Sequence, residues 1–137
     1  MLFETGDDLR SKEVLKCIEI ERIDADIEFR NVPDSSKYKY KKGSWKDYFK
    51  NVLMAQSRGK EYKEICSREH CDCDGDDEIV GAHIHKSNEA QTQIWIALVC
   101  KSTNNLSDET PFKLKKGSII VKFSKNSLLT TIEDRNR

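Results

Sequence analysis

Long apolar runs are missing from this sequence, and so is an excess of charge of either sign. No segment approaches the roughly 20 consecutive apolar residues that a helix needs to cross a bilayer. Residues 1–8 have neither the basic start nor the apolar stretch of a secretory signal peptide. The 24 Lys and Arg residues are balanced by 24 Asp and Glu residues. We therefore expect a cytoplasmic protein that does not enter the membrane.

Apolar residues are also scarce over the whole chain. They make up 36% of the 137 residues, and charged residues make up 35%. This length suits one domain, residues 1–137, with a modest core. A core this thin would gain stability from a bound metal ion.

One segment concentrates the residue types that bind zinc. Cysteine and histidine crowd into residues 66–85, and one more cysteine follows; the set is Cys66, His70, Cys71, Cys73, His83, His85 and Cys100. Thiolate and imidazole are ligands that zinc prefers, and a structural site uses four of them. Five cysteines, an odd number clustered with histidines, favour metal binding in a reducing compartment over a disulfide framework. The alternative to a zinc site is that these cysteines are buried thiols that bind no metal. We expect this for Cys17, which lies far from the other cysteines in the sequence.

The segments around these residues predict a zinc-centred ββα unit. A turn at 74–77 precedes a strand that starts at Ile79 and runs through Ile84. The apolar run 94–99 has the length of a second strand, and Cys100 would open a helix directly after it.

Two earlier segments show clear periodicity. Apolar and charged residues alternate over 23–29, which predicts a half-buried strand. A helix is predicted from residue 45 because apolar residues recur at helical spacing, namely Trp45, Tyr48, Phe49, Val52 and Leu53. Ser44 and Asp47 approximate a capping box at its start. Residues 9–17 fit a short helix or the start of a strand.

The C-terminal part is predicted to complete the domain. Residues 112–114 and 119–123 flank a Lys-Lys-Gly-Ser turn, which predicts a β-hairpin. Residues 124–137 become polar and are expected to fray. The predicted fold class is α+β, with an N-terminal strand and helix region over 1–36, a zinc-stabilised ββα unit with its flanking helix within 37–123, and the C-terminal hairpin.

Charge is distributed unevenly along the chain. Residues 37–63 hold nine basic and two acidic residues, whereas 64–80 hold seven acidic residues and only Arg68 as a base. Residues 111–125 contain five lysines and no acidic residue. Such blocks can mark faces that bind nucleic acid or a charged protein. An ordinary solvated surface is the alternative.

The basic block begins with alternating lysine and tyrosine. Residues 37–42, Lys-Tyr-Lys-Tyr-Lys-Lys, have a pattern that can stack bases and contact phosphates. The same pattern suits an edge strand with its tyrosines pointing inward. On the helix that follows, two lysines four residues apart share one flank. The predicted partner-binding residues are Tyr38, Lys39, Tyr40, Lys41, Lys42, Lys46 and Lys50.

The order of these motifs resembles the HNH-type treble-clef family. A cysteine knuckle precedes Gly-Ala-His-Ile at 81–84, and an apolar strand then leads into Cys-x-x-x-Asn at 100–104. The resemblance is to small HNH-like zinc proteins of bacterial and phage genomes, and it covers about residues 43–123. It implies that Cys66, Cys71 and Cys100 bind zinc. It also implies that His83 occupies the place of the general base of HNH nucleases, and that Asn104 occupies the place of a histidine that binds the catalytic metal.

The sequence departs from the family pattern at three points. The family's second helical zinc ligand falls at Thr103, which is not a normal zinc ligand, so Cys73 or His85, with His70 as a further candidate, would complete the site. Asn104 replaces the catalytic-metal histidine. The asparagine that orients the base has no counterpart, since its place is near Trp95. A nuclease needs a base within reach of water and a divalent metal on the scissile phosphate. The resemblance therefore implies a retained fold without catalysis.

These observations lead to a main functional expectation and an alternative. The main expectation is a non-catalytic module with a structural Zn²⁺ that binds a protein or a nucleic acid. A variant of it is a phage-encoded inhibitor of a bacterial defence nuclease of the CRISPR type. The alternative is an HNH-type endonuclease that uses His83 as general base together with Mg²⁺ or Mn²⁺.

Overall fold

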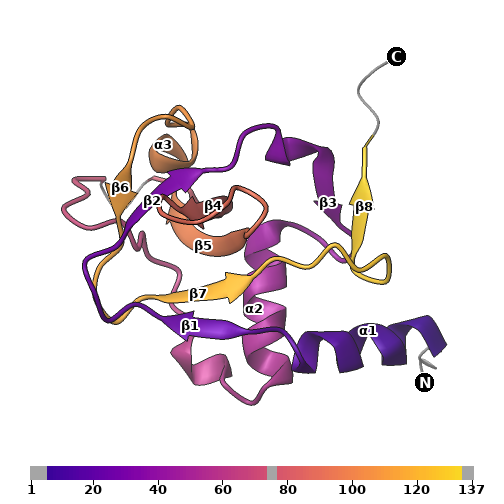
Figure 1. Ribbon diagram of the computed structural model, residues 1–137. Coiled ribbons are helices and arrows are strands. Elements are labelled where there is room, and N and C mark those ends of the chain that lie inside the picture. Colours follow the sequence, from indigo (N-terminus) through magenta and orange to yellow (C-terminus); the bar gives the residue numbers. More distant parts are fainter. Residues whose placement is uncertain (1–5, 74–76, 134–137) are drawn as a thin grey trace.

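The computed structural model describes residues 6–73 and 77–133, and it shows short strands interspersed with helices (Figure 1). The predicted turn at 74–77 lies mostly outside the described residues. The elements in chain order are α1 (Gly6–Lys16), β1 (Ile20–Arg22), β2 (Glu28–Asn31), η1 (Ser35–Lys37), β3 (Tyr38–Tyr40), α2 (Trp45–Ala55), η2 (Gly59–Glu61), β4 (Ile79–Lys86), β5 (Trp95–Cys100), α3 (Lys101–Asn104), β6 (Phe112–Lys113), β7 (Ile119–Lys122) and β8 (Thr130–Ile132).

Six of the strands form one curled antiparallel sheet. Its strand order is β1-β7-β5-β4-β2-β6, and β3 pairs with β8 in a separate two-stranded sheet. The longest pairing joins β4 to β5, in a register that sets Ile79 opposite Cys100 and Ile84 opposite Trp95. The predicted α+β class is therefore confirmed.

The central strand β5 is buried on both faces. Ile96 and Leu98, with Ile94 directly before the strand, belong to the apolar cluster on the side of α1 and α2. Trp95, Ala97 and Val99 alternate with them and belong to the cluster on the opposite side. Because successive side chains of a strand point to opposite faces, this continuous apolar run supplies two small cores at once.

Helix α2 starts as the sequence predicts and lies against β4 and β5 (Figure 1). The Ser44 hydroxyl accepts the Asp47 N–H, and the Asp47 carboxylate accepts the Ser44 N–H at 2.9 Å, which completes the capping box. Tyr48, Phe49, Val52 and Leu53 form its buried stripe. The start of the helix approaches β4 so closely that a Cβ at Gly81 would lie 2.5 Å from the Trp45 carbonyl carbon.

The N-terminal region differs in part from the predicted pattern. Residues 9–17, which fitted helix or strand, lie mainly in the helix α1. The strand predicted over 23–29 is wrong, because β1 ends at Arg22 and β2 begins at Glu28. β1 pairs with β7 and β2 pairs with β4, so the intervening residues connect two separate positions of the sheet. The alternation reflected the burial of Ile23 and Phe29, which does not require a continuous strand.

The predicted C-terminal hairpin is also wrong. The turn is present, since the Ser118 N–H donates to the Lys115 carbonyl at 3.0 Å, but β6 pairs with β2 and β7 pairs with β5 and β1. The two strands therefore lie at different places in the same sheet. The tail that was expected to fray includes β8, which pairs with β3 in the register Tyr40 to Thr130.

We predict that Gly81→Ala destabilises the protein by about 2 kcal/mol or more, because the new methyl group would meet backbone atoms of α2 that cannot move alone. The free energy of unfolding from urea titration measures this loss. Gly6→Ala is the control, since a Cβ at Gly6 has no atom within 4 Å. An unchanged stability of the Gly81 variant would show that α2 is not held at this distance.

Candidate metal centre and the His83 cleft

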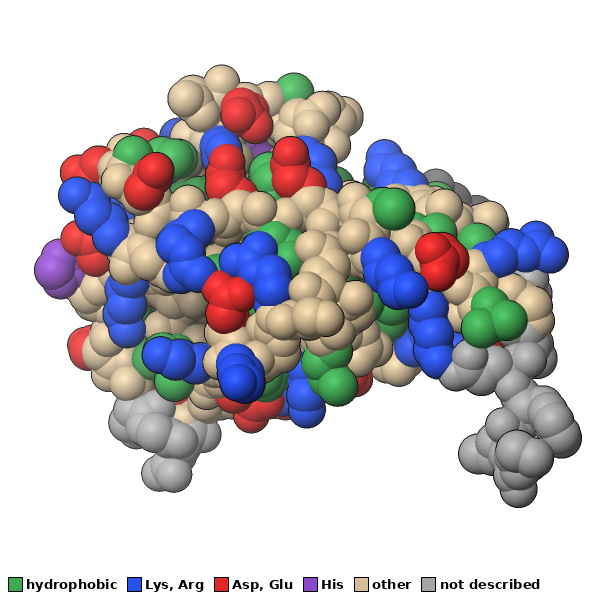
Figure 2. Space-filling view, turned by 90° about the horizontal axis from the view of Figure 1, so that it is seen from below, with side chains coloured by type: hydrophobic (Ala, Val, Ile, Leu, Met, Phe, Trp, Pro, Cys, Tyr) green, Lys and Arg blue, Asp and Glu red, His purple; other side chains and the backbone are tan. Residues whose placement is uncertain are grey.

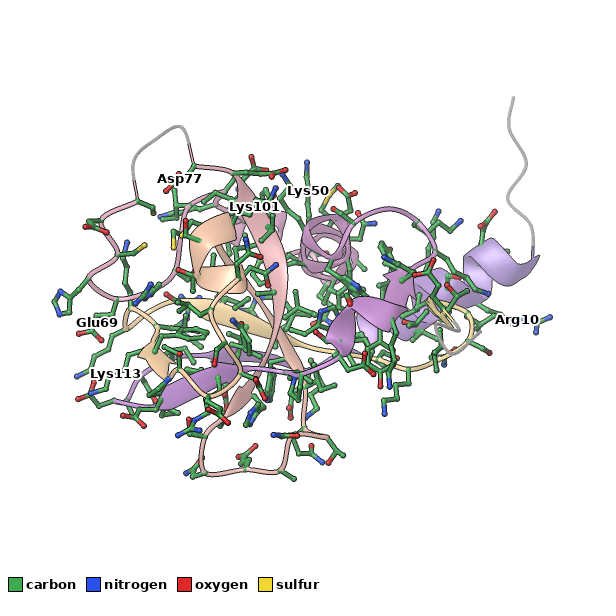
Figure 3. All side chains as sticks on the ribbon, turned by 90° about the horizontal axis from the view of Figure 1, so that it is seen from above. Arg10, Lys50, Glu69, Asp77, Lys101 and Lys113 are labelled. Carbon is green, nitrogen blue, oxygen red and sulfur yellow. The ribbon has the colours of Figure 1, made fainter. Side chains whose placement is uncertain are left out.

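Four cysteine sulfur atoms converge where the loop after η2 meets the end of β5. The Sγ atoms of Cys66, Cys71, Cys73 and Cys100 all lie within 4.8 Å of one another, and Cys71 Sγ is 3.7 Å from Cys100 Sγ. Sulfur ligands of a tetrahedral zinc ion, each about 2.3 Å from the metal, are about 3.8 Å apart. The donor set and its spacing therefore fit a structural zinc ion. Figure 3 shows sulfur atoms, in yellow, between the loop that carries Glu69 and the start of α3 near Lys101.

Backbone pairing brings these four residues together. Cys100 is the last residue of β5 and directly precedes α3. The loop that carries the other three cysteines is fixed beside β5 because the Ser67 N–H donates to the Leu98 carbonyl at 2.9 Å. Arg68 forms a β-bridge with Leu114 on the other side of this loop. The Cys100 N–H also donates to Cys66 Sγ at 3.3 Å, a contact that stabilises a thiolate.

The close thiols perturb one another's ionisation. Burial raises the pKa of Cys66. Burial also acts to raise the pKa of Cys71, but hydrogen bonds from Cys73, Cys100 and Cys66 outweigh it and lower that pKa to about 7. The contact with Cys71 is the main cause that raises the pKa of Cys73 to about 12. The thiolate form of Cys71 is thus stabilised, whereas ionisation of Cys66 and Cys73 is disfavoured. A divalent cation bound to the group would allow all four thiols to ionise.

The structure brings Cys73, and neither of the candidate histidines, to this group. His85 lies near the other end of β4, about 20 Å along the strand from the residue opposite Cys100. Its Nδ1 lies 2.9 Å from the Lys86 carbonyl oxygen. The His70 side chain is 90% exposed and lies beside Glu69. Cys17 is outside the group, as expected, but it is exposed rather than buried.

Two residues next to the thiols were not predicted as part of the site. Thr103, at the position of the family's second helical ligand, is fully buried, and its hydroxyl lies 3.2 Å from Cys100 Sγ. Lys115 donates from Nζ to the Cys66 carbonyl at 3.3 Å. Its only signal in the sequence was its place in a stretch of lysines without acidic residues.

The short helix α3 is held in place by a buried asparagine of β2. Asn31 Nδ2 donates to the carbonyl oxygens of Thr103 and Leu106, each at 3.0 Å. These acceptors lie in the last turn of α3 and just after it. Asn31 therefore fixes the position of α3, the helix that directly follows Cys100.

A second concave region lies on the other side of β4. It is a cleft of about 550 Å³ between η1, β3, the start of α2 and the end of α3. His83 and Asn104, the two predicted catalytic residues, both line it, and Asp34 is a further lining residue that the sequence did not single out. The structure therefore brings the predicted catalytic pair to one cleft.

The His83 side chain is enclosed by aromatic rings. Its ring centroid is 4.9 Å from that of Trp45 and 5.3 Å from that of Phe123, both in edge-to-face orientation. The side chain is 8% exposed, and its Nε2 has no hydrogen-bond partner among the described residues. Burial lowers the pKa of His83 to about 4, so the ring is neutral at pH 7. His83 thus packs mainly as an aromatic core residue.

The predicted partner-binding residues do not form a uniformly basic surface. Tyr38 and Tyr40 are only 9% and 5% exposed, so the inward orientation holds and neither ring is available for stacking. Several of the lysines pair with carboxylates; the pairs are Lys39–Glu133, Lys42–Asp8 and Lys46–Glu64. Lys50 lies over the Tyr62 ring, and Lys41 is exposed.

Comparisons with protein-family models, with curated proteins and with solved structures find no match. The resemblance to HNH proteins therefore rests on the motif residues themselves. Among the described residues, no helix has the length and apolar character required to span a membrane.

We predict that the purified protein contains one zinc ion per chain. Cys73→Ala and Cys100→Ala should each lose the metal and most of the folded state, because structural zinc sites contribute on the order of 10 kcal/mol to small domains. Elemental analysis and circular dichroism measure the two effects. Cys17→Ala and His85→Phe are controls that should keep the zinc. Full zinc occupancy in Cys73→Ala, or its loss in His85→Phe, would contradict this ligand set.

We also predict that His83 makes stability depend on pH. With a folded pKa of about 4 and an unfolded pKa of about 6.5, the unfolded state binds the proton more readily between these values. The free energy of unfolding should therefore fall as pH drops from about 6.5 to about 4, by on the order of 3 kcal/mol, and His83 should add no further loss below that range.

His83→Phe should flatten this dependence, whereas His70→Gln, at an exposed ring, should leave it unchanged. Urea titrations over this pH range measure the difference between each variant and the wild type, which removes any loss common to all three proteins. Identical profiles for wild type and His83→Phe would show that His83 is not held neutral by burial.

Proposed function

We propose that this protein is a non-catalytic binding module whose fold is stabilised by zinc. The observation that carries the proposal is the convergence of the thiols of Cys66, Cys71, Cys73 and Cys100. A site whose four ligands all come from protein leaves no open position for substrate, which is the character of structural rather than catalytic zinc. We assign the zinc ion the role of holding the loop at 66–73 against the end of β5 and the start of α3.

The environment of His83 supports the absence of catalysis. A general base must lie within hydrogen-bond reach of the proton it removes, directly or through one water molecule. The Nε2 atom of His83 is buried beneath aromatic rings. Its low pKa also makes it a weak base at neutral pH.

The module would then act by binding a partner, a protein or a nucleic acid. Uneven surface charge supports this role, since complementary charge steers association and selects partners. Inhibition of a bacterial defence nuclease, including a CRISPR-type nuclease, would be one form of such binding.

An HNH-type endonuclease is the second candidate, and one observation favours it. His83 and Asn104 line the same cleft, together with the Asp34 carboxylate. An amide oxygen and a carboxylate are groups that can contribute to Mg²⁺ or Mn²⁺ binding. In this reading His83 would activate water for attack on a phosphodiester.

We predict that the zinc-loaded protein does not cleave plasmid DNA or RNA in the presence of Mg²⁺ or Mn²⁺. Agarose gel electrophoresis of supercoiled plasmid detects single nicks and is the sensitive measurement. His83→Ala and Asn104→Ala are assayed in parallel to identify contamination by a host nuclease. Cleavage by the wild type that is lost in both variants would establish the endonuclease and overturn the non-catalytic proposal.

A further inference from the structure

The fold brings two separate basic segments to one cleft. The cleft has a volume of about 430 Å³ and lies between η2, β1 and the turn at 115–118. Its basic lining residues are Arg22, Lys60, Lys63, Lys115 and Lys116, and Glu61 is its only acidic lining residue among those described. Figure 2, which views the molecule from below, shows Lys and Arg side chains spread over this face around small apolar areas.

The four lysines of this cleft differ from most lysines of the basic block. Lys60, Lys63, Lys115 and Lys116 are exposed, and none of them forms an ion pair within the described part of the chain. Unpaired like charges around a concave surface repel one another and raise the local positive potential. The cleft is therefore suited to a negatively charged ligand.

The floor of the cleft is apolar. Phe49, Leu98 and Ile119 contribute to its lining, and each is a buried core residue. Ile65 also lines the cleft, and it is 55% exposed. A cleft that combines unpaired cations with an apolar lining is suited to a ligand that offers both negative charge and apolar groups.

These features favour a protein segment over nucleic acid. Binding of single-stranded nucleic acid relies on exposed aromatic side chains for base stacking, and the aromatic residue that lines this cleft, Phe49, is only 4% exposed. Glu61 shows that a carboxylate fits here, since it accepts hydrogen bonds from Arg22 and Arg58.

One wall of the cleft depends on the metal centre. The Lys115 N–H donates to the Ser67 carbonyl at 2.8 Å, and Lys115 Nζ contacts the Cys66 carbonyl. Both acceptors belong to the loop that carries the thiols. A zinc ion at these cysteines would hold this loop, and through it the turn at 115–118, in the position that forms the cleft.

We propose that this cleft, formed by Arg22, Lys60, Lys63, Lys115 and Lys116 above an apolar floor with Ile65, binds an acidic protein segment that carries apolar side chains. The inference rests on the proposed function, because it assigns the partner-binding face of the module. It assigns that face to basic residues other than the lysines that the sequence pattern suggested.

The test uses the full-length zinc-loaded protein and a short fluorescent peptide of Glu, Leu and Gly. Binding is measured by fluorescence anisotropy at low salt, against the same peptide with Gln in place of Glu and against one with Gly in place of Leu. Single-stranded and duplex DNA oligonucleotides of similar total charge serve as competing probes. We expect the acidic, leucine-containing peptide to bind best, and its affinity to fall with salt.

Charge reversal locates the binding face. The variant with Lys60→Glu, Lys63→Glu and Lys116→Glu should lose at least about tenfold in affinity for the peptide. The matched control, with Lys41→Glu, Lys42→Glu and Lys125→Glu, changes the net charge by the same amount and should stay within about twofold of the wild type, because none of these residues lines the cleft. Replacing Ile65 with Ser should also weaken binding, because it removes the exposed apolar contact.

Three outcomes would overturn the inference. The first is equal loss of affinity in both triple variants, which would show that net charge alone explains the loss. The second is tighter binding of DNA than of the peptide with loss in the same cleft variant, which would assign the cleft to nucleic acid. The third is no binding of the peptide by a protein that holds one zinc ion per chain, which leaves the zinc proposal intact. Peptide binding by a folded protein without zinc would instead overturn the zinc proposal alone.

Discussion

The pairing of β4 with β5 is the constraint on which both candidate sites depend. Its register sets Ile79 opposite Cys100, so the chain enters β4 beside the end of β5, where the thiols meet. The same register carries His83 to the middle of β4, on the face covered by Trp45 of α2. A shift by one residue would move every side chain of β4 to the opposite face. The close approach of Gly81 to the Trp45 backbone opposes such a shift, since a neighbouring residue of β4 in its place would bring a Cβ against α2.

A metal ion bound by the four thiols would compensate for a thin core. The loop from Cys66 to Cys73 contains no helix or strand, and few of its residues are apolar. A few backbone hydrogen bonds hold this loop against the sheet. Its remaining attachment is the contact of its three thiols with Cys100. Zinc coordination by these thiols would replace there the apolar burial that a larger domain would have. The position of Lys115 follows from this arrangement, because it contacts the backbone of the same loop.

The density of unpaired charge on the folded surface differs from the density of charge along the sequence. The basic block in residues 37–63 is dense in sequence, but Lys39, Lys42 and Lys46 are near carboxylates from distant segments. The lysines around the cleft between η2, β1 and the turn at 115–118 come from two segments more than fifty positions apart. They lack such partners within the described residues. Local charge density therefore does not measure the potential of a folded face, because pairing across the surface decides which charges remain.

The sequence by itself determined the features that depend on near neighbours. The start of α2 follows from Ser44, Asp47 and an apolar stripe, and β5 follows from an apolar run too short for a core helix. The candidate thiols could be predicted because cysteine and histidine cluster locally and zinc requires these ligands. The alternation of lysine and tyrosine in β3 allowed two interpretations, and an edge strand with inward-pointing tyrosines was one of them.

Only the tertiary structure decided what depends on distant partners. It separated β6 from β7, which looked like a hairpin, since Phe112 pairs with Phe29 and Trp95 with Lys122. It brought Cys73 rather than His85 to the thiols, because position along β4 and not closeness in sequence sets the distance to Cys100. It also gathered Arg22, Lys60 and Lys116 at one cleft. Strand pairing and the meeting of side chains are non-local, and no local pattern of residues encodes them.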